Sequence, residues 1–109
     1  MIDIDGLVDC GALRLDRVFR DAHWNKDREI GQYMVDKYND NCDVIGEEVA
    51  AVHLETTIAY GIQGYRIATY YGEDAERDDG GEEYLDREKA IRTGRKHIER
   101  IKELRARNK

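Results

Sequence analysis

The clearest pattern of apolar and polar positions lies in the middle of the chain. From residue 52 to residue 62, every even position carries an apolar or β-branched side chain: Val52, Leu54, Thr56, Ile58, Tyr60 and Ile62. A period of two is typical of a β-strand with one buried face. After Gln63 and Gly64 the phase changes, and the corresponding set becomes Tyr65, Ile67, Thr69 and Tyr71. The change of phase predicts a second strand.

We therefore expect a β-hairpin with a two-residue turn at 63–64, in which Gly64 takes the positive φ that such turns require. This turn places Ile62 opposite Tyr65 and pairs buried positions with buried positions along the rest of the hairpin. The spacing of apolar residues over 47–60 also fits a helix. The dominance of β-branched and aromatic residues favours the strand.

The first 41 residues predict two helices. Apolar residues recur there at intervals of three and four, which is the spacing of one helix face. They are Leu15, Val18, Phe19 and Ala22, followed by Ile30, Tyr33, Met34 and Tyr38. Asn25 either caps the second helix or lies inside one long helix. The segment 39–41 (Asn-Asp-Asn) ends the helical region, because these side chains bond to their own backbone.

The C-terminal region predicts a long helix that begins after Asp86, a favoured N-cap residue. Leu85 and Ala90 have the spacing of a hydrophobic staple. One apolar stripe follows: Ala90, Ile91, Gly94, Ile98, Ile101 and Leu104. Glycine in mid-helix costs about 1 kcal/mol relative to alanine, so we expect a close approach to the sheet at Gly94. Residues 82–85 are a candidate for a short third strand.

These elements predict one small α+β domain over 1–109. Two N-terminal helices precede a β-hairpin, with or without a third short strand, and the long C-terminal helix packs on the sheet. A chain of 109 residues has the usual size of a single domain. It can bury a core without metals or disulfides.

Composition excludes several classes of protein. No apolar run approaches the length of a membrane span. The start Met1-Ile2-Asp3-Ile4-Asp5 lacks the basic and apolar parts of a signal peptide. The two cysteines, Cys10 and Cys42, form no CxxC pair. We therefore expect a reduced, cytoplasmic protein, while a Cys10–Cys42 bridge stays open as an alternative.

Candidate catalytic and metal-binding chemistry is weak. Four residues are chemically suited to zinc, but they are too far apart to form the closely spaced pairs of a structural site: Cys10, His23, Cys42 and His53. The chain has no serine nucleophile and no glycine-rich phosphate loop. We expect a protein that is not an enzyme and has no cofactor. A small metal-assisted hydrolase that uses carboxylates such as Glu47 and Glu48 remains an alternative.

Charge is strongly segregated along the chain. Residues 73–86 contain eight acidic residues and one basic residue, whereas 87–109 contain ten basic and three acidic residues. A dense array of carboxylates is suited to the basic surface of another protein. The other interpretation of this segment is a solvated loop, or a loop folded against the basic helix of its own chain.

The charge pattern leads to an expected function. We expect a non-catalytic acidic protein-interaction domain, an inhibitor or regulator that binds a basic surface of a nucleic-acid-handling protein, as mobile elements and phages often encode. Aromatic residues such as Trp24, Tyr70 and Tyr71 add anchors if they are exposed. The candidate protein-binding residues are Asp74, Glu76, Asp78, Asp79, Glu82, Glu83 and Tyr70.

The alternative function uses the opposite charge. Basic residues recur on the side of the C-terminal helix opposite its apolar stripe, and such a row is able to meet nucleic-acid phosphates. They are Lys89, Arg92, Lys96, Arg100 and Arg107. The acidic whole-chain balance and i,i+4 pairs such as Glu88 with Arg92 argue for an ordinary solvated helix instead. A bare hairpin edge also allows a homodimer.

Overall fold

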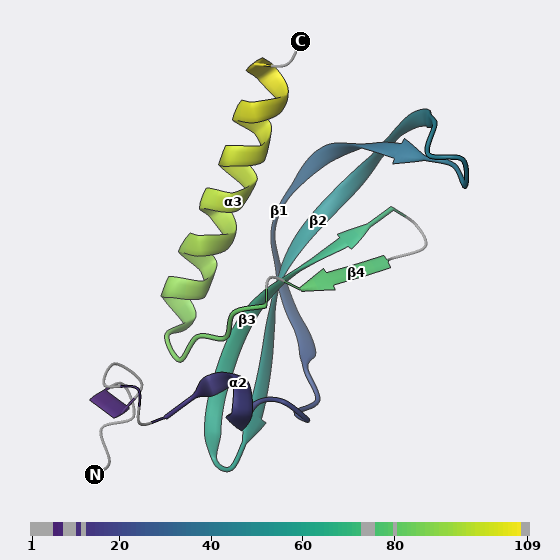
Figure 1. Ribbon diagram of the computed structural model, residues 1–109. Helices are drawn as coiled ribbons and strands as arrows, with labels where there is room; N and C mark the ends of the chain where they lie inside the picture. Colours follow the sequence, from purple (N-terminus) through teal and green to yellow (C-terminus); the bar gives the residue numbers. More distant parts are fainter. Residues whose placement is uncertain (1–5, 8–10, 12, 73–75, 80, 108–109) are drawn as a thin grey trace.

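The computed structural model describes residues 6–7, 11, 13–72, 76–79 and 81–107 (Figure 1). Four strands form one antiparallel sheet in the order β1-β2-β3-β4, and the long helix α3 lies along one of its faces. The elements are α2 (Leu15–Val18), β1 (Asn25–Tyr38), β2 (Val44–Ala59), β3 (Ile62–Tyr71), β4 (Glu76–Asp79) and α3 (Arg87–Arg107). The predicted α+β class and the C-terminal helix on the sheet are confirmed.

The β2–β3 hairpin has the predicted faces over 52–56 and 65–71 but a different turn, and Ile58 and Tyr60, predicted to be buried, are exposed. Ala59 pairs with Ile62, so the two turn residues are Tyr60 and Gly61 rather than 63–64. Both have positive φ, 54° and 74°, as a tight hairpin turn of matching twist requires. The observed pairing is displaced by an even number of positions from the pairing that a turn at 63–64 would give. The even residues of β2 therefore still pair with odd residues of β3, as Leu54 does with Ile67.

The two predicted N-terminal helices are wrong. The described part of this region contains only the four-residue helix α2, and the expected second helix is the strand β1. The register of β1 against β2 shifts at three places, one of them between Glu29 and Gly31. A bulge breaks the alternation of a strand. Here the bulge places both Ile30 and Gly31 on the side of the sheet that faces α3. Ile30 and Tyr33 then contact the same core although they are three positions apart, which is a spacing typical of a helix.

The start and the apolar stripe of α3 are as predicted. The Asp86 carboxylate accepts a hydrogen bond from the backbone N–H of Glu88 at 3.0 Å, which is an N-cap interaction. At Gly94 an added Cβ would lie 2.7 Å from Ile30 Cδ1. The helix therefore approaches the sheet closely where the glycine occurs. Only the last stripe residue, Leu104, is exposed.

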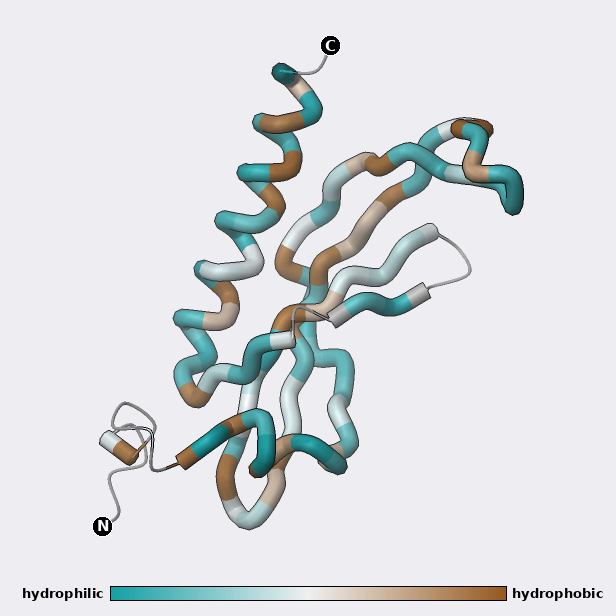
Figure 2. Tube along the Cα trace, in the orientation of Figure 1, coloured by the Kyte–Doolittle hydropathy of each residue, from teal (hydrophilic) through white to brown (hydrophobic). Residues whose placement is uncertain are grey.

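The core lies between α3 and the sheet. Two clusters of buried residues meet the inner side of the helix, and Figure 2 shows hydrophobic positions where the strands pass beside it. Their buried members are Tyr33, Ala50, Val52, Leu54, Ala90, Ile91 and Ile98. In the described part of the chain, no helix is long and apolar enough to cross a membrane.

On the opposite face of the sheet, the segment around α2 covers the part near the β2–β3 turn. Phe19, which follows α2, is buried, and its ring lies above Gly64. Its ring meets that of Trp24 edge to face at 5.6 Å between centroids. The Thr57 hydroxyl donates a 2.6 Å hydrogen bond to the His23 carbonyl. These contacts fix the segment before β1 against the sheet.

Candidate functional site

The acidic segment is not simply a loop, because part of it forms strand β4. Asp78 pairs with Thr69, and Arg77 pairs with Tyr70. Successive side chains of a strand point to opposite faces, so β4 sends Asp78 toward α3 and Arg77 to the other face. The predicted strand at 82–85 is reduced to one bridge, in which Tyr84 and Tyr65 exchange two backbone hydrogen bonds.

On the face away from α3, Arg77 joins a buried ionic network. Its centre is Glu55, which is only 2% exposed. The Glu55 carboxylate accepts hydrogen bonds from Arg66 Nε at 2.8 Å, from the Tyr70 hydroxyl at 2.6 Å and from Arg77 Nε at 2.9 Å. A second nitrogen of Arg77 bonds to the other carboxylate oxygen. Four donors from two strands thus saturate this buried acid.

The environment of Glu55 determines its ionisation. Burial by itself raises the pKa of the Glu55 carboxyl. The hydrogen bonds from Arg77, Tyr70 and Arg66 outweigh burial and lower the pKa to about 2. Because Arg66 and Tyr70 of β3 and Arg77 of β4 all donate to Glu55 of β2, this network holds β4 to the sheet. We assign it a structural role.

On the other face, a hollow of about 530 Å³ lies between α3 and the β3–β4 side of the sheet. Its walls combine apolar, aromatic, hydroxyl and acidic side chains. They are Tyr33, Val35, Ile67, Thr69, Tyr71, Asp78, Glu82, Tyr84, Thr93, His97 and Ile101. A concave, largely apolar site with a few convergent polar groups is the usual form of a ligand pocket.

The polar groups of the hollow are linked to one another. The Tyr33 hydroxyl lies 3.4 Å from His97 Nε2, and the Tyr84 hydroxyl donates to the Glu82 carboxylate at 2.6 Å. Burial, a hydrogen bond with Tyr33 and the nearby negative charges raise the pKa of Tyr71 to about 12. Its phenol is therefore neutral at physiological pH. The hollow holds neutral hydroxyls beside two carboxylates.

The carboxylates at the rim are exposed to solvent. Within the described residues, neither Asp78 nor Glu82 forms an ion pair with a lysine or arginine. The arginines of α3 pair elsewhere: Arg105 lies 3.5 Å from Asp36 and 3.3 Å from Glu47. The basic helix therefore neutralises acids of β1 and β2, and leaves these two rim carboxylates to solvent.

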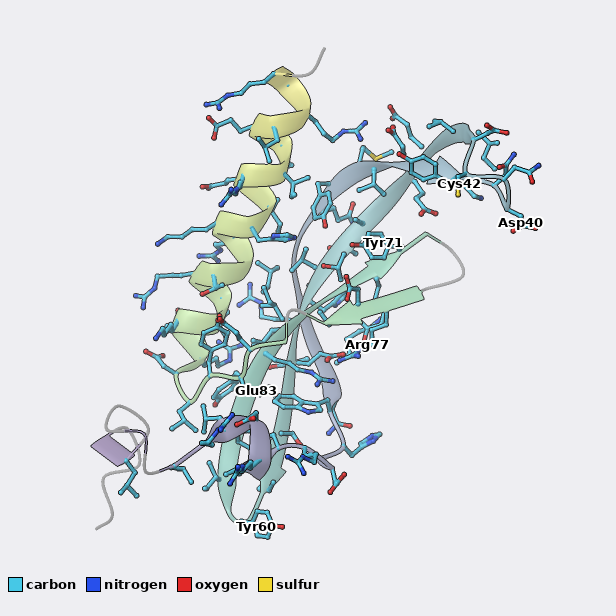
Figure 3. The ribbon with its side chains drawn as sticks, in the orientation of Figure 1. Asp40, Cys42, Tyr60, Tyr71, Arg77 and Glu83 are labelled. Carbon is cyan, nitrogen blue, oxygen red and sulfur yellow. The ribbon has the colours of Figure 1, made fainter. Side chains whose placement is uncertain are left out.

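The structure brings only some of the predicted protein-binding residues together. Asp78 and Glu82 line the hollow, and Glu83 follows them half-buried. Glu76 and Asp79 lie at the two ends of β4. Asp74 lies outside the described residues. Tyr70 is apart from the others, because its hydroxyl bonds to Glu55 on the opposite face. Figure 3 labels Tyr71, Arg77 and Glu83 in this region.

The predicted basic row of α3 is exposed along the helix, and this set comprises Lys89, Arg92, Lys96, Arg100 and Arg107. Arg107 pairs with Glu103, and the Lys89 ammonium lies 5.9 Å from the centroid of the Tyr84 ring. Arg92, Lys96 and Arg100 form no ion pair among the described residues. The row is thus a solvated cationic ridge.

The considered metal ligands do not converge in the described part of the chain, where no cluster of three or more His, Cys, Asp or Glu side chains is arranged to hold a metal ion. Cys42 is an exposed free thiol. It lies near Asp40 at the far end of the β1–β2 hairpin (Figure 3). His53 lies in β2, and Cys10 lies outside the described residues. Because Cys42 is a free thiol, the alternative, a Cys10–Cys42 bridge, is not formed in this structure.

The sequence did not predict the Glu55 network, and it did not predict that Tyr33 and His97 line the hollow. One signal for the network was present, since Arg77 is the only basic residue within the acidic segment 73–86. A lone base in such a segment suggests a specific carboxylate partner. Nothing in the sequence places Tyr33 beside His97, which lies 64 positions away.

Comparisons of the chain with protein families, with curated proteins and with solved structures found no match.

Proposed function

We propose that the protein is a non-catalytic interaction domain that binds a basic surface of another protein through its acidic edge. The acidic edge is the surface formed by β4 and the residues before α3, with Asp78 and Glu82 as its principal groups. The single observation that carries the proposal is that these two exposed carboxylates form no ion pair with a lysine or arginine of the described residues and flank an aromatic hollow. As an inhibitor or regulator, the domain would cover a basic surface that handles nucleic acid.

Electrostatics and packing both support this function. Complementary charges accelerate encounter and select the partner, while desolvated aromatic contacts supply much of the affinity. The acidic edge combines the two, because Tyr71 and Tyr84 stand directly beside the carboxylates. The network around Glu55 holds β4, and hence Asp78, against the sheet. A preorganised surface loses less entropy on binding than a free loop does.

The test is a charge reversal at the acidic edge. Wild-type protein and the double variant Asp78→Lys/Glu82→Lys are used as baits in extracts of the native host, and captured proteins are quantified by mass spectrometry. Candidate partners are then purified, and their affinity is measured at low and moderate salt. We expect a basic partner whose binding weakens by about 100-fold or more in the double variant, since opposed charges are replaced by like charges.

The matched control reverses two exposed carboxylates elsewhere, Asp40→Lys and Glu99→Lys, which changes the net charge equally. Circular dichroism and thermal unfolding confirm that both variants fold. The proposal fails if the acidic-edge variant and the control bind the purified partner equally well, or if the partner contacts another surface.

A second function is favoured by one observation, the cationic ridge of α3. Arg92, Lys96 and Arg100 are exposed and lack ion pairs within the described chain. Such a ridge suits nucleic-acid phosphates. Fluorescence anisotropy with labelled duplex and single-stranded DNA at low and moderate salt tests it. Salt-sensitive binding that Arg92→Glu/Lys96→Glu abolishes supports this second function, whereas no binding at low salt rejects it.

A further inference from the structure

The hollow between α3 and the β3–β4 side of the sheet has a chemistry more specific than that of a general acidic surface. Its apolar wall consists of Val35, Ile67 and Ile101, which come from three different elements. Tyrosine rings and two carboxylates complete the lining. Its volume of about 530 Å³ falls within the ~300–1,000 Å³ that is usual for ligand pockets.

The lining of the hollow contains carboxylates, whereas Lys89 lies outside it, over the Tyr84 ring. Among the described residues that line it, none is a lysine or an arginine, and two are carboxylates, Asp78 and Glu82. Burial and a hydrogen bond with Tyr33 are the main causes that raise the pKa of Tyr71, and the negative charges of Asp78 and Glu48 add to them. Burial disfavours any charge, whereas these negative charges favour a cation.

The aromatic rings of this chain already attract cations. Lys89 lies over Tyr84, at one wall of the hollow, with its ammonium 5.9 Å from the ring centroid. On the opposite face of the sheet, Lys26 lies 4.3 Å from the Tyr70 ring centroid. Ring faces attract ammonium groups because of their quadrupole, and the attraction grows when the site is shielded from water.

We propose that this hollow binds an alkylammonium group, supplied by a lysine side chain of the partner protein. The inference rests on the proposed function and deepens it, because it names the group that the acidic edge recognises. The four-carbon stem of lysine packs against Val35, Ile67 and Ile101, as long cationic side chains do on apolar surfaces. The ammonium then meets the tyrosine rings and the carboxylates of Asp78 and Glu82.

The test uses Nα-acetyl-lysine amide as a small probe, with isotope-labelled protein followed by NMR. We expect saturable shifts at Tyr71, Thr93 and His97, which line the hollow. The norleucine analogue, which keeps the stem but lacks the ammonium, should bind about tenfold more weakly or worse, because it loses the charge-assisted contacts. Shifts outside the hollow, or equal affinity for the two probes, would overturn the inference.

Two variants and one control sharpen the test. Asp78→Asn removes a rim charge at constant shape and should weaken lysine binding by about tenfold. Thr93→Lys places an ammonium on the α3 wall and should block the probe. Glu99→Gln, on the exposed side of α3, should bind as the wild type does. Undiminished binding in Asp78→Asn contradicts the inference, as does tighter binding of the arginine analogue.

The two proposals fail separately. If the charge reversal abolishes binding of the protein partner but the lysine probe gives no shifts in the hollow, the interaction surface stands and the lysine site is rejected. If the probe binds in the hollow but no basic protein binds the acidic edge, the proposed function is rejected, and with it the assignment of the site to a lysine of a partner. The hollow is then a binding site for a small alkylammonium ligand.

Discussion

At the scale of single residues, Glu55 is buried on the face away from α3. Arg66, Tyr70 and Arg77 all donate hydrogen bonds to it, and they come from the two strands that follow β2. A buried ion pair of this kind contributes little net stability compared with an apolar substitute. Loss of one partner is costly, however, because it leaves uncompensated charge. Glu55 therefore links β4 to the sheet through Arg77, in addition to the backbone pairing of β4 with β3.

We predict that Glu55→Gln lowers the free energy of unfolding by about 3 kcal/mol, because two arginines lose their shared counter-ion. Urea denaturation followed by far-ultraviolet circular dichroism measures the change. Glu99→Gln, at an exposed position of α3, is the control and should stay within about 0.5 kcal/mol of wild type. A loss below 1 kcal/mol in Glu55→Gln would show that the network is not important for stability.

The same carboxyl predicts how stability depends on pH. Its pKa is lowered from 4.5 to about 2 in the folded protein, so the folded state binds the proton less readily than the unfolded state does. The contribution is therefore fully present above about pH 4.5 and is lost as pH falls toward 2, by about 3 kcal/mol in total. Denaturation at pH 6 and pH 3 should show a smaller difference in Glu55→Gln than in wild type.

At the level of elements, two glycines lie where secondary-structure elements pack closely against each other. Gly94 brings α3 against Ile30, and Gly64 lies beneath the Phe19 ring. The turn at Tyr60 and Gly61 needs positive φ instead. A substitution is tolerated less well at Gly64 than at Gly94. A Cβ at Gly64 would lie 2.5 Å from a carbon of the rigid Phe19 ring, whereas at Gly94 the nearest atom is the end of the flexible Ile30 side chain.

We predict that Gly64→Ala destabilises the protein by about 1–3 kcal/mol through overpacking against Phe19. The double variant Gly64→Ala/Phe19→Leu should lose less than the sum of the two single variants, since the smaller side chain relieves the clash. Thermal unfolding of the four proteins in the cycle provides the measurement. Strict additivity would mean that the segment containing α2 does not pack on Gly64 in solution.

On the scale of the whole molecule, the sheet extends well beyond the part that α3 covers. The principal extents are 53 × 27 × 23 Å. In Figure 3, Asp40 and Cys42 lie at one end and Tyr60 lies at the other. The end of the β1–β2 hairpin exposes apolar side chains, among them those of Val44 and Ile45. Figure 2 shows hydrophobic positions at this end of the molecule. Stability should therefore be distributed unevenly along the sheet.

We predict that amide hydrogen exchange is slowest in β2 over residues 50–57 and faster by orders of magnitude at 36–46. The central part of β2 lies between two strands and contains five buried residues, whereas every residue of 36–46 is exposed. Exchange follows local opening, which is easier where few apolar contacts hold the backbone. Equal protection in the two segments would indicate that an assembly covers the hairpin end.

The sequence by itself determined the elements whose signals are local. The Asp86 cap and the stripe from Ala90 to Ile98 predicted α3, and strict alternation predicted the buried faces of β2 and β3. These features follow from the geometry of the backbone, with periods near 3.6 and 2, and need no distant partner. The sequence also shows directly that the segment before α3 is acidic.

Only the tertiary structure decided the rest, because the deciding contacts join residues far apart in the chain. The bulge at Ile30 places the Ile30 side chain against Gly94 of α3, and it gives the apolar residues of β1 a spacing like that of a helix. Pairing with β3 makes β4 a strand, and its alternation sends Arg77 to Glu55 and Asp78 to the hollow. Whether an acidic residue is neutralised inside the fold or exposed at its edge depends on strand pairing, which local composition does not encode.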